Sequence, residues 1–199
     1  ISEYDPMIVR HFLAVSLLFV FATACAHKDS HRMIAVEGEV PLASVSSDTA
    51  LERLKSGNER YVSGQTVWSG LSQETIGAHT AGQNPYAIVL SCADSRVPVE
   101  HVFDAGIGEL FVLRVAGNVA TDEAIGSAEY ALAALNSPLL VVMGHSSCGA
   151  VGGALTLNDS AAFPDRLQAL LADIQTTLRE EGAAEGDIAT AVSANVDAQ

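Results

Sequence analysis

Two short polar clusters in the sequence carry side chains that commonly bind a metal ion. The first is CADSR, which begins at Cys92, and the second is HSSCG, which begins at His145, 51 residues after Asp94. With Cys148 included, these residues supply two thiolates, one imidazole and one carboxylate. This combination binds zinc and leaves room for a reacting water molecule. The clusters therefore predict a catalytic zinc site.

A disulfide is the alternative interpretation of the same cysteines. The chain has three cysteines, and Cys25 lies in an apolar amino-terminal segment, which leaves Cys92 and Cys148. In an exported protein the default expectation for such a pair is a disulfide bond. A disulfide explains neither Asp94 nor His145, which accompany the cysteines at ligand spacing. We therefore favour the metal site.

Each cluster follows an apolar run of strand length. The two runs cover residues 86–91 (YAIVLS) and 139–144 (LLVVMG), and a third covers 109–116 (ELFVLRVA). Nearly unbroken apolar runs of this length are typical of parallel strands that helices cover on both faces. The carboxyl ends of parallel strands share one edge of a sheet, and ligands usually bind there. The sequence thus predicts an α/β fold that places both clusters at that edge.

Helices are expected around these strands. The segment from Asp122 to Leu135 starts with two acidic residues and continues with apolar residues at helical spacing. A capping-box pattern at Thr49 predicts a helical arm near the amino terminus, whereas residues 71–85 carry turn signals. Further helices are expected at about 148–157, 164–182 and 187–199.

The motifs resemble those of the β-class carbonic anhydrases. CADSR and GHSSCGAV are similar to the two zinc motifs of that family, and the pieces at 98–100 (PVE) and 116–118 (AGN) follow in the family's order. The resemblance extends from about Ala50 to the end of the chain. It implies the β-carbonic anhydrase fold, with a central, mostly parallel β-sheet flanked by helices and an amino-terminal helical arm.

The resemblance also implies a site and an activity. One zinc ion per subunit would be held by Cys92, His145 and Cys148, with water or Asp94 in the fourth position. The activity implied is the reversible hydration of carbon dioxide to bicarbonate and a proton. Homodimers or homotetramers are implied as the assembly. Val89 stands where members with a bicarbonate-stabilised closed form commonly carry Trp, which favours the open form with water on the metal.

The other residues of the two clusters have expected roles in this chemistry. Zinc would lower the pKa of a bound water enough to give a nucleophile near neutral pH. Asp94 would accept a hydrogen bond from it, and Arg96 would keep the Asp94 carboxylate charged and placed. Gly149 could offer its N–H to a developing bicarbonate oxygen. Two thiolates cancel the charge of the ion, so we predict activity that rises through alkaline pH.

Two other functions fit the same motifs. A related zinc lyase acting on carbonyl sulfide or carbon disulfide would use the same metal ligands with a different entrance. A non-catalytic exported zinc-binding module would need no Asp94 and Arg96 pair. We assign the domain to residues 49–199. The family normally continues with a further helix and a final strand, so we expect the carboxyl-terminal part of the domain to be missing.

Composition narrows the choice of partners. The hydrophobic content of 49% is ample for a folded core, and the formal net charge is -14. Nucleic-acid binding needs clustered basic residues, but the 10 Lys and Arg residues of this chain are scattered. We therefore expect a small-molecule substrate and no nucleic-acid partner.

The amino-terminal residues predict export. Residues 12–24 form an apolar run of 13 residues, which is shorter than the roughly 20 needed to span a bilayer. We expect residues 1–26 to be a leader and residues 27–48 to be a linker. Cleavage before Cys25 would leave a cysteine that weakly resembles a bacterial lipidation site. The predicted location is the periplasm, either as a free protein or as a lipoprotein anchored through Cys25.

Overall fold

The computed structural model describes residues 45–67, 70–158 and 163–199. The predicted leader, Cys25 and residues 27–44 of the predicted linker lie outside this part of the chain. None of the helices in the described part is long and apolar enough to cross a membrane.

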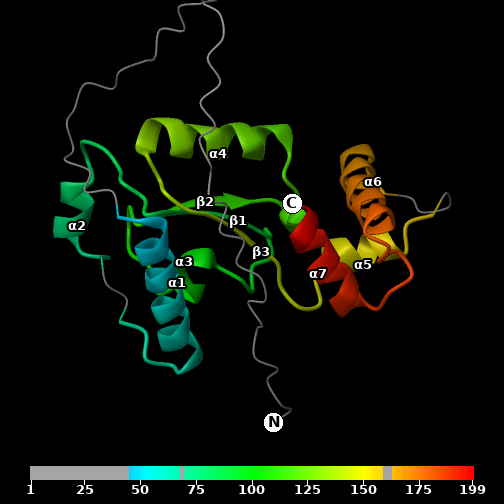
Figure 1. Cartoon of the computed structure of the whole chain (residues 1–199), viewed down its shortest axis with the longest axis horizontal. Coiled ribbons are helices and arrows are strands. Elements are labelled where there is room, and N and C mark those ends of the chain that lie inside the picture. The colour runs from blue at the N-terminus through cyan, green and yellow to red at the C-terminus, as the bar shows by residue number, and fades with distance from the viewer. Residues whose placement is uncertain (1–44, 68–69, 159–162) are drawn as a thin grey trace, which may run out of the picture.

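The described residues form a parallel sheet of three strands, β1 (Ala87–Ser91), β2 (Leu110–Arg114) and β3 (Leu140–Met143). The strand order is β2-β1-β3, so β1 is the central strand (Figure 1). All five residues of β1 are buried, as a strand covered on both faces requires. The three apolar runs are therefore confirmed as parallel strands.

Helices cover the two faces of the sheet. Helix α4 (Asp122–Leu135) lies on one face, and α1 (Ser47–Val62) and α3 (Val99–Val102) lie on the other (Figure 1). Successive side chains of a strand point to opposite faces. Ile88 accordingly packs with Ala131 and Leu135 of α4, whereas Val89 belongs to the larger core on the other face. Because its side chains alternate between the two faces, β1 packs against the helices on both sides of the sheet.

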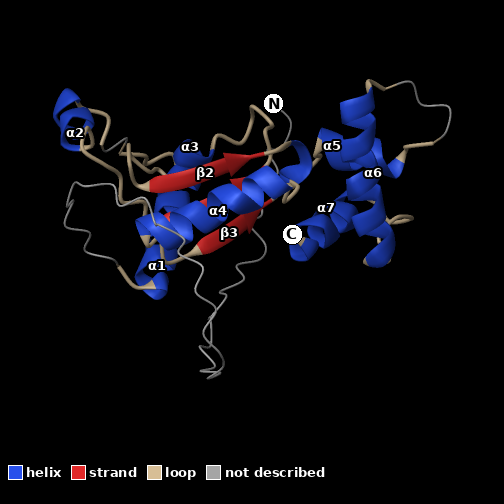
Figure 2. Cartoon of the chain, turned by 90° about the horizontal axis from the view of Figure 1, so that it is seen from above, coloured by secondary structure: helices blue, strands red, loops and turns tan. Residues whose placement is uncertain are grey.

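A second group of helices lies beyond the carboxyl ends of the strands (Figure 2). It consists of α5 (Gly149–Leu155), α6 (Asp165–Glu180) and α7 (Ile188–Ala198), which contact one another. Helix α6 buries Leu171, Ile174 and Leu178, whose spacing places them on one side of the helix. This helical group therefore stands next to the sheet edge where the two polar clusters end.

Several element boundaries differ from the sequence-based expectation. Helix α1 starts before Thr49, because the Ser46 hydroxyl accepts from the Thr49 N–H at 3.1 Å and caps the helix. Helix α2 (Gln73–Ala78) occupies part of the segment for which turns were expected. The short α3 was also missed. Helices of four to six residues show too little periodicity to be predicted, and tertiary packing stabilises them.

Candidate metal centre

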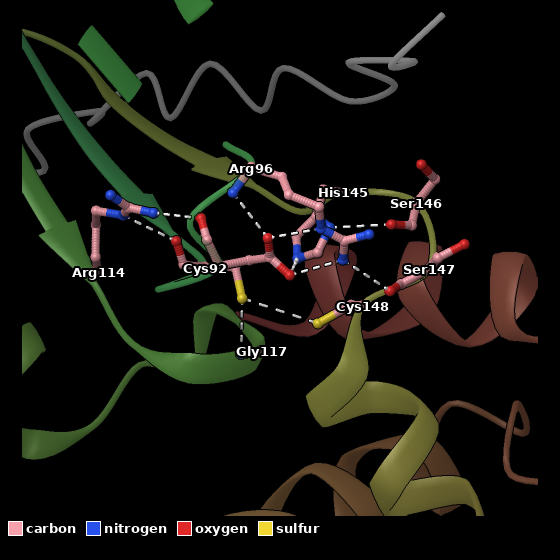
Figure 3. Close-up of polar contacts among 9 residues, drawn as sticks. Cys92, Arg96, Arg114, Gly117, His145, Ser146, Ser147 and Cys148 are labelled. Carbon is pink, nitrogen blue, oxygen red and sulfur yellow. Dashed lines mark hydrogen bonds and ion pairs between the residues drawn. The ribbon is translucent and has the colours of Figure 1, made fainter. Parts of the chain in front are cut away.

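The two polar clusters meet at the carboxyl edge of the sheet (Figure 3). Cys92 directly follows β1, His145 lies two residues after β3, and Cys148 is the N-cap residue of α5. Strands β1 and β3 are parallel neighbours, so their carboxyl ends bring the clusters together.

The three side chains form a compact donor set. The ligand atoms of Cys92, His145 and Cys148 all lie within 4.8 Å of one another, and all three residues are buried. The two sulfur atoms are 3.9 Å apart. Tetrahedral zinc with bonds of about 2.3 Å to sulfur would place two thiolates about 3.8 Å apart. The donor set therefore fits zinc. Both cysteines are free thiols, so the disulfide alternative is not realised.

The orientation of His145 leaves one ring nitrogen for a ligand bond. Its Nδ1 lies 3.0 Å from the carbonyl oxygen of Ser146, an acceptor, so Nδ1 carries the proton and donates. The other nitrogen, Nε2, is buried and has no hydrogen-bond partner. A buried acceptor without a partner is costly, and a metal ion would satisfy it.

The two thiols have pKa values shifted in opposite directions. The Cys148 thiol donates to the Cys92 sulfur, and this contact holds the pKa of Cys92 well below its usual value. The same contact, together with burial, raises the pKa of Cys148. Two buried thiolates side by side repel each other, and a divalent cation between them would remove that repulsion.

Cys92 receives a further hydrogen bond from the backbone. The N–H of Gly117 donates to the Cys92 sulfur at 3.3 Å. Gly117 lies in the short helix η1 (Ala116–Asn118) with a φ of 69°, in the left-handed region that favours glycine. A Cβ at this position would also lie 2.6 Å from Cδ1 of Ile174. Glycine is therefore favoured at the position whose N–H reaches the sulfur.

Asp94 lies beside the donor set and is held by Arg96. Its Oδ1 accepts from Arg96 Nε at 2.8 Å and from the Arg96 backbone N–H at 2.9 Å, and its Oδ2 accepts from Nη2 at 2.7 Å. These bonds hold the pKa of the Asp94 carboxyl far below its usual range. Arg96 also donates to the Ser147 carbonyl at 3.3 Å, which links the two clusters. Asp94 Oδ2 lies 3.7 Å from His145 Nε2.

Arg114 is a residue of the site that the sequence analysis missed. Its Nε donates to the carbonyl oxygen of Cys92 at 3.0 Å, and its Nη2 donates to that of Asp94 at 2.5 Å. Arg114 is paired with Ser91 in the register of β1 and β2, which places it beside the end of β1. The parallel register of β1 and β2 could have predicted this position, because it puts the last residue of β2 next to the first cluster.

The remaining predicted roles concern Asp94 as a ligand and Gly149 as a donor. Gly149 is the first residue of α5, directly after Cys148. Asp94 is engaged by Arg96 and does not belong to the compact donor set. Both roles stay predictions.

Comparison with known proteins relates the chain to one family. A family model described as "Carbonic anhydrase" matches residues 87–199. The chain is 46% identical over 115 residues to carbonic anhydrase 2 of Mycobacterium tuberculosis, which covers 58% of this chain and 56% of that protein. It is 44% identical over 115 residues to a carbonic anhydrase of Mycolicibacterium smegmatis, with the same coverage. The chain thus spans a little over half the length of these curated relatives.

Solved structures agree on the fold. The structure resembles the Coccomyxa β-carbonic anhydrase in complex with acetazolamide, with a TM-score of 0.57, 22% identity and coverage of 78% of this chain and 70% of that one. It also resembles the β-carbonic anhydrase CcaA, with a TM-score of 0.54, 28% identity and coverage of 76% and 72%. The arrangement of sheet and helices is that of the β-carbonic anhydrase fold.

Proposed function

The chain belongs to the carbonic anhydrase family, and on that basis we propose that it catalyses the reversible hydration of carbon dioxide to bicarbonate and a proton. We propose that Cys92, His145 and Cys148 hold one zinc ion per subunit. The observation that carries the proposal is the geometry of the three donor atoms, which lie within 4.8 Å of one another with a charged carboxylate beside them.

A bound zinc ion would supply a nucleophile near neutral pH, because it lowers the pKa of a water molecule that it coordinates. The residues of the chain determine how that chemistry is oriented. His145 is fixed in one tautomer by its bond to the Ser146 carbonyl, which keeps Nε2 free for the metal. Gly117 donates to the Cys92 sulfur and stabilises its thiolate form.

Asp94 acts as an oriented acceptor. Arg96 keeps the carboxylate ionised and fixes both of its oxygens, so Asp94 can accept a hydrogen bond at a defined position near His145 Nε2. Its low pKa makes it a poor base, so Asp94 does not store the proton that hydration releases. That proton must be passed to a group other than Asp94.

Gly149 is proposed as a donor to the developing bicarbonate oxygen. Support comes from its place in the chain, directly after the ligand Cys148 at the start of α5. A backbone N–H next to a ligand is fixed by the fold and needs little reorganisation during the reaction.

Export and assembly are proposed from the sequence alone. The apolar run at 12–24 supports a leader over residues 1–26 and a periplasmic location, either as a free protein or as a lipoprotein anchored through Cys25. A homodimer or homotetramer is proposed by family resemblance. Cell fractionation and light scattering of the purified protein test these proposals, and a cytoplasmic monomer would contradict both.

The hydration proposal is tested with the purified, zinc-loaded chain. We expect one zinc ion per chain and a stopped-flow rate of carbon dioxide hydration well above that of buffer. A folded, zinc-loaded chain without this activity would overturn the proposal, as would absence of stoichiometric zinc. Parallel assays with carbonyl sulfide and carbon disulfide decide the substrate, because faster turnover of either would assign the chain to a related lyase activity.

A further inference from the structure

We propose that Asn195, in the last helix of the chain, is a positioning residue of the metal centre. Its side-chain Nδ2 donates to the carbonyl oxygen of Gly117 at 2.8 Å, and the N–H of Gly117 donates to the Cys92 sulfur at 3.3 Å. The two hydrogen bonds are in series, so Asn195 acts on the thiolate through one residue. This inference rests on the proposed zinc site.

The Gly117 peptide needs an external support. Gly117 is buried and adopts a left-handed conformation, and a Cβ added there would lie 2.6 Å from Cδ1 of Ile174. Glycine has no side chain and the widest conformational freedom of any residue, so nothing within the residue itself fixes the direction of its N–H. The bond from Asn195 holds the carbonyl of the peptide unit that follows Gly117, whereas the N–H that faces Cys92 belongs to the peptide unit that precedes it. Asn195 therefore acts on this N–H by restraining the backbone dihedral angles of Gly117, which join the two units.

The burial of Asn195 indicates that its amide is kept for this bond. The side chain is fully buried, and its Oδ1 has no hydrogen-bond partner. A buried amide with one half unsatisfied costs stability, which an aliphatic side chain of the same size would avoid. The Nδ2 bond to Gly117 is the interaction that an aliphatic residue could not replace.

Helix α7 also contacts the second ligand-bearing segment. Gly144, which precedes His145, lies so close to α7 that an added Cβ would be 2.5 Å from Cγ2 of Val196. On the other side, Gln199 Oε1 accepts from the N–H of Ala120 at 2.7 Å. Helix α7 and its C-cap residue therefore contact the segment that precedes His145 and the segment of η1 that donates to Cys92, and Asn195 makes the polar contact with Gly117.

Loss of the Asn195 bond should have two effects on the metal. An N–H that points at a thiolate withdraws electron density from sulfur, so a weaker bond should move thiolate-to-metal charge transfer to lower energy. A less fixed ligand should also bind zinc less tightly, by about 10- to 100-fold for an outer-shell partner. Neither effect is expected from a change that only lowers stability.

The test compares Asn195→Leu and Asn195→Asp with Gln175→Leu. Gln175 is a matched control, because its side-chain amide donates to the carbonyl oxygens of Ala154 and Leu157 at 3.0 and 3.1 Å, away from the thiols. Each variant is loaded with Co²⁺ for its charge-transfer spectrum, and zinc affinity is measured by competition with a chelator. We expect the Asn195 variants to show a red shift and about 10- to 100-fold weaker zinc binding. Gln175→Leu should lower only the unfolding temperature.

Several outcomes would overturn the inference. Asn195 variants with the spectrum and zinc affinity of the parent would do so, and so would an equal change in Gln175→Leu. A measurement on the unmodified chain needs no variant to fold: with ¹¹³Cd in the site, the Gly117 amide should show scalar coupling to the metal through the sulfur, and its absence would remove the second bond of the series. If the parent binds neither Co²⁺ nor Zn²⁺, the proposed function fails as well. If the parent binds both, only the role of Asn195 is at stake.

Discussion

Arg96 forms a bidentate ion pair with Asp94, with Nε 2.8 Å from Oδ1 and Nη2 2.7 Å from Oδ2. The pair lies beside the donor set formed by Cys92, His145 and Cys148, with Asp94 Oδ2 3.7 Å from His145 Nε2. Because Arg96 binds both oxygens of Asp94, we expect the carboxylate not to turn onto a bound metal ion. The pair therefore favours a site with a free coordination position.

Replacing Arg96 by Ala should lower carbon dioxide hydration by about 10- to 100-fold, since the outer-shell partner that holds Asp94 is lost. Zinc should be retained, because Asp94 becomes free to bind it. Stability should change little, because the Arg96 side chain is 62% exposed. Stopped-flow assays and metal analysis test this. Arg179→Ala, which removes an exposed contact with Gln175 on α6, is the control. Equal rates for Arg96→Ala and the parent would contradict the role of the pair.

Replacing Cys148 by Ser should weaken zinc binding by more than the roughly 10- to 100-fold cost of losing an outer-shell partner. The physical reason is the loss of one of two thiolates that balance the charge of the ion. Zinc content after dialysis against a chelator is the measurement, with Gln175→Leu as the control. Full retention of zinc in Cys148→Ser would exclude this residue as a ligand.

The hydration rate should rise with pH through the alkaline range. Two thiolates neutralise the charge of the zinc ion, so the site activates water less strongly than one built from neutral histidines. The pH–rate profile of the zinc-loaded chain tests this. A profile that is flat from pH 6 upward would speak against a site with two thiolate ligands.

Tyr86 should make stability fall in strongly alkaline solution. Burial, with a smaller effect from Glu109, raises the pKa of Tyr86 from 10.0 to about 12. Since the folded pKa lies above the unfolded one, the contribution is complete below pH 10 and is lost as pH rises toward 12. A shift of this size corresponds to about 3 kcal/mol. The free energy of unfolding, measured in urea between pH 9 and 12, should fall less steeply with pH for Tyr86→Phe than for the parent. Identical pH dependence of the two proteins would refute the expectation.

Replacing Gly57 by Ala should destabilise the fold. Gly57 lets α1 pack against α3, and an added Cβ would collide with the carbonyl oxygen of Phe103, a backbone atom that cannot move aside. We expect a loss of at least about 3 kcal/mol in the free energy of unfolding. Gly126→Ala on α4 is the matched control: no atom lies within 4 Å of its added Cβ, and it should gain roughly 0.5–1 kcal/mol. Similar urea midpoints for the two variants would contradict the packing argument.

The strands and the place of the donor set could be predicted from local patterns. Cys92 and His145 each follow an apolar run of strand length, and parallel strands bring such positions to one edge. Within each of the two motifs the residues are close together in the chain, so their spacing alone indicates a metal site. The α/β class followed from the same runs.

The contacts that support the donor set could not be predicted in this way. Gly117 reaches the sulfur of a residue 25 positions earlier, and Asn195 reaches Gly117 from 78 positions later. Neither residue forms a local pattern with its partner, because each contact joins segments that lie far apart in the sequence and meet only in the folded domain. The short α3 was missed for a related reason, since its helical form depends on packing under α1 and not on its own periodicity.

The two ligand-bearing segments have a consequence for the order of assembly. Cys92 and His145 are 53 positions apart, and they meet only when β3 has paired with β1. During synthesis from the amino terminus, Cys92 emerges long before its partners and offers a single thiol, which holds a cation only weakly. Stable capture of the ion therefore waits until Cys148 has emerged and the crossover between the strands is complete. An ion held by all three donors therefore reports that β3 has paired with β1.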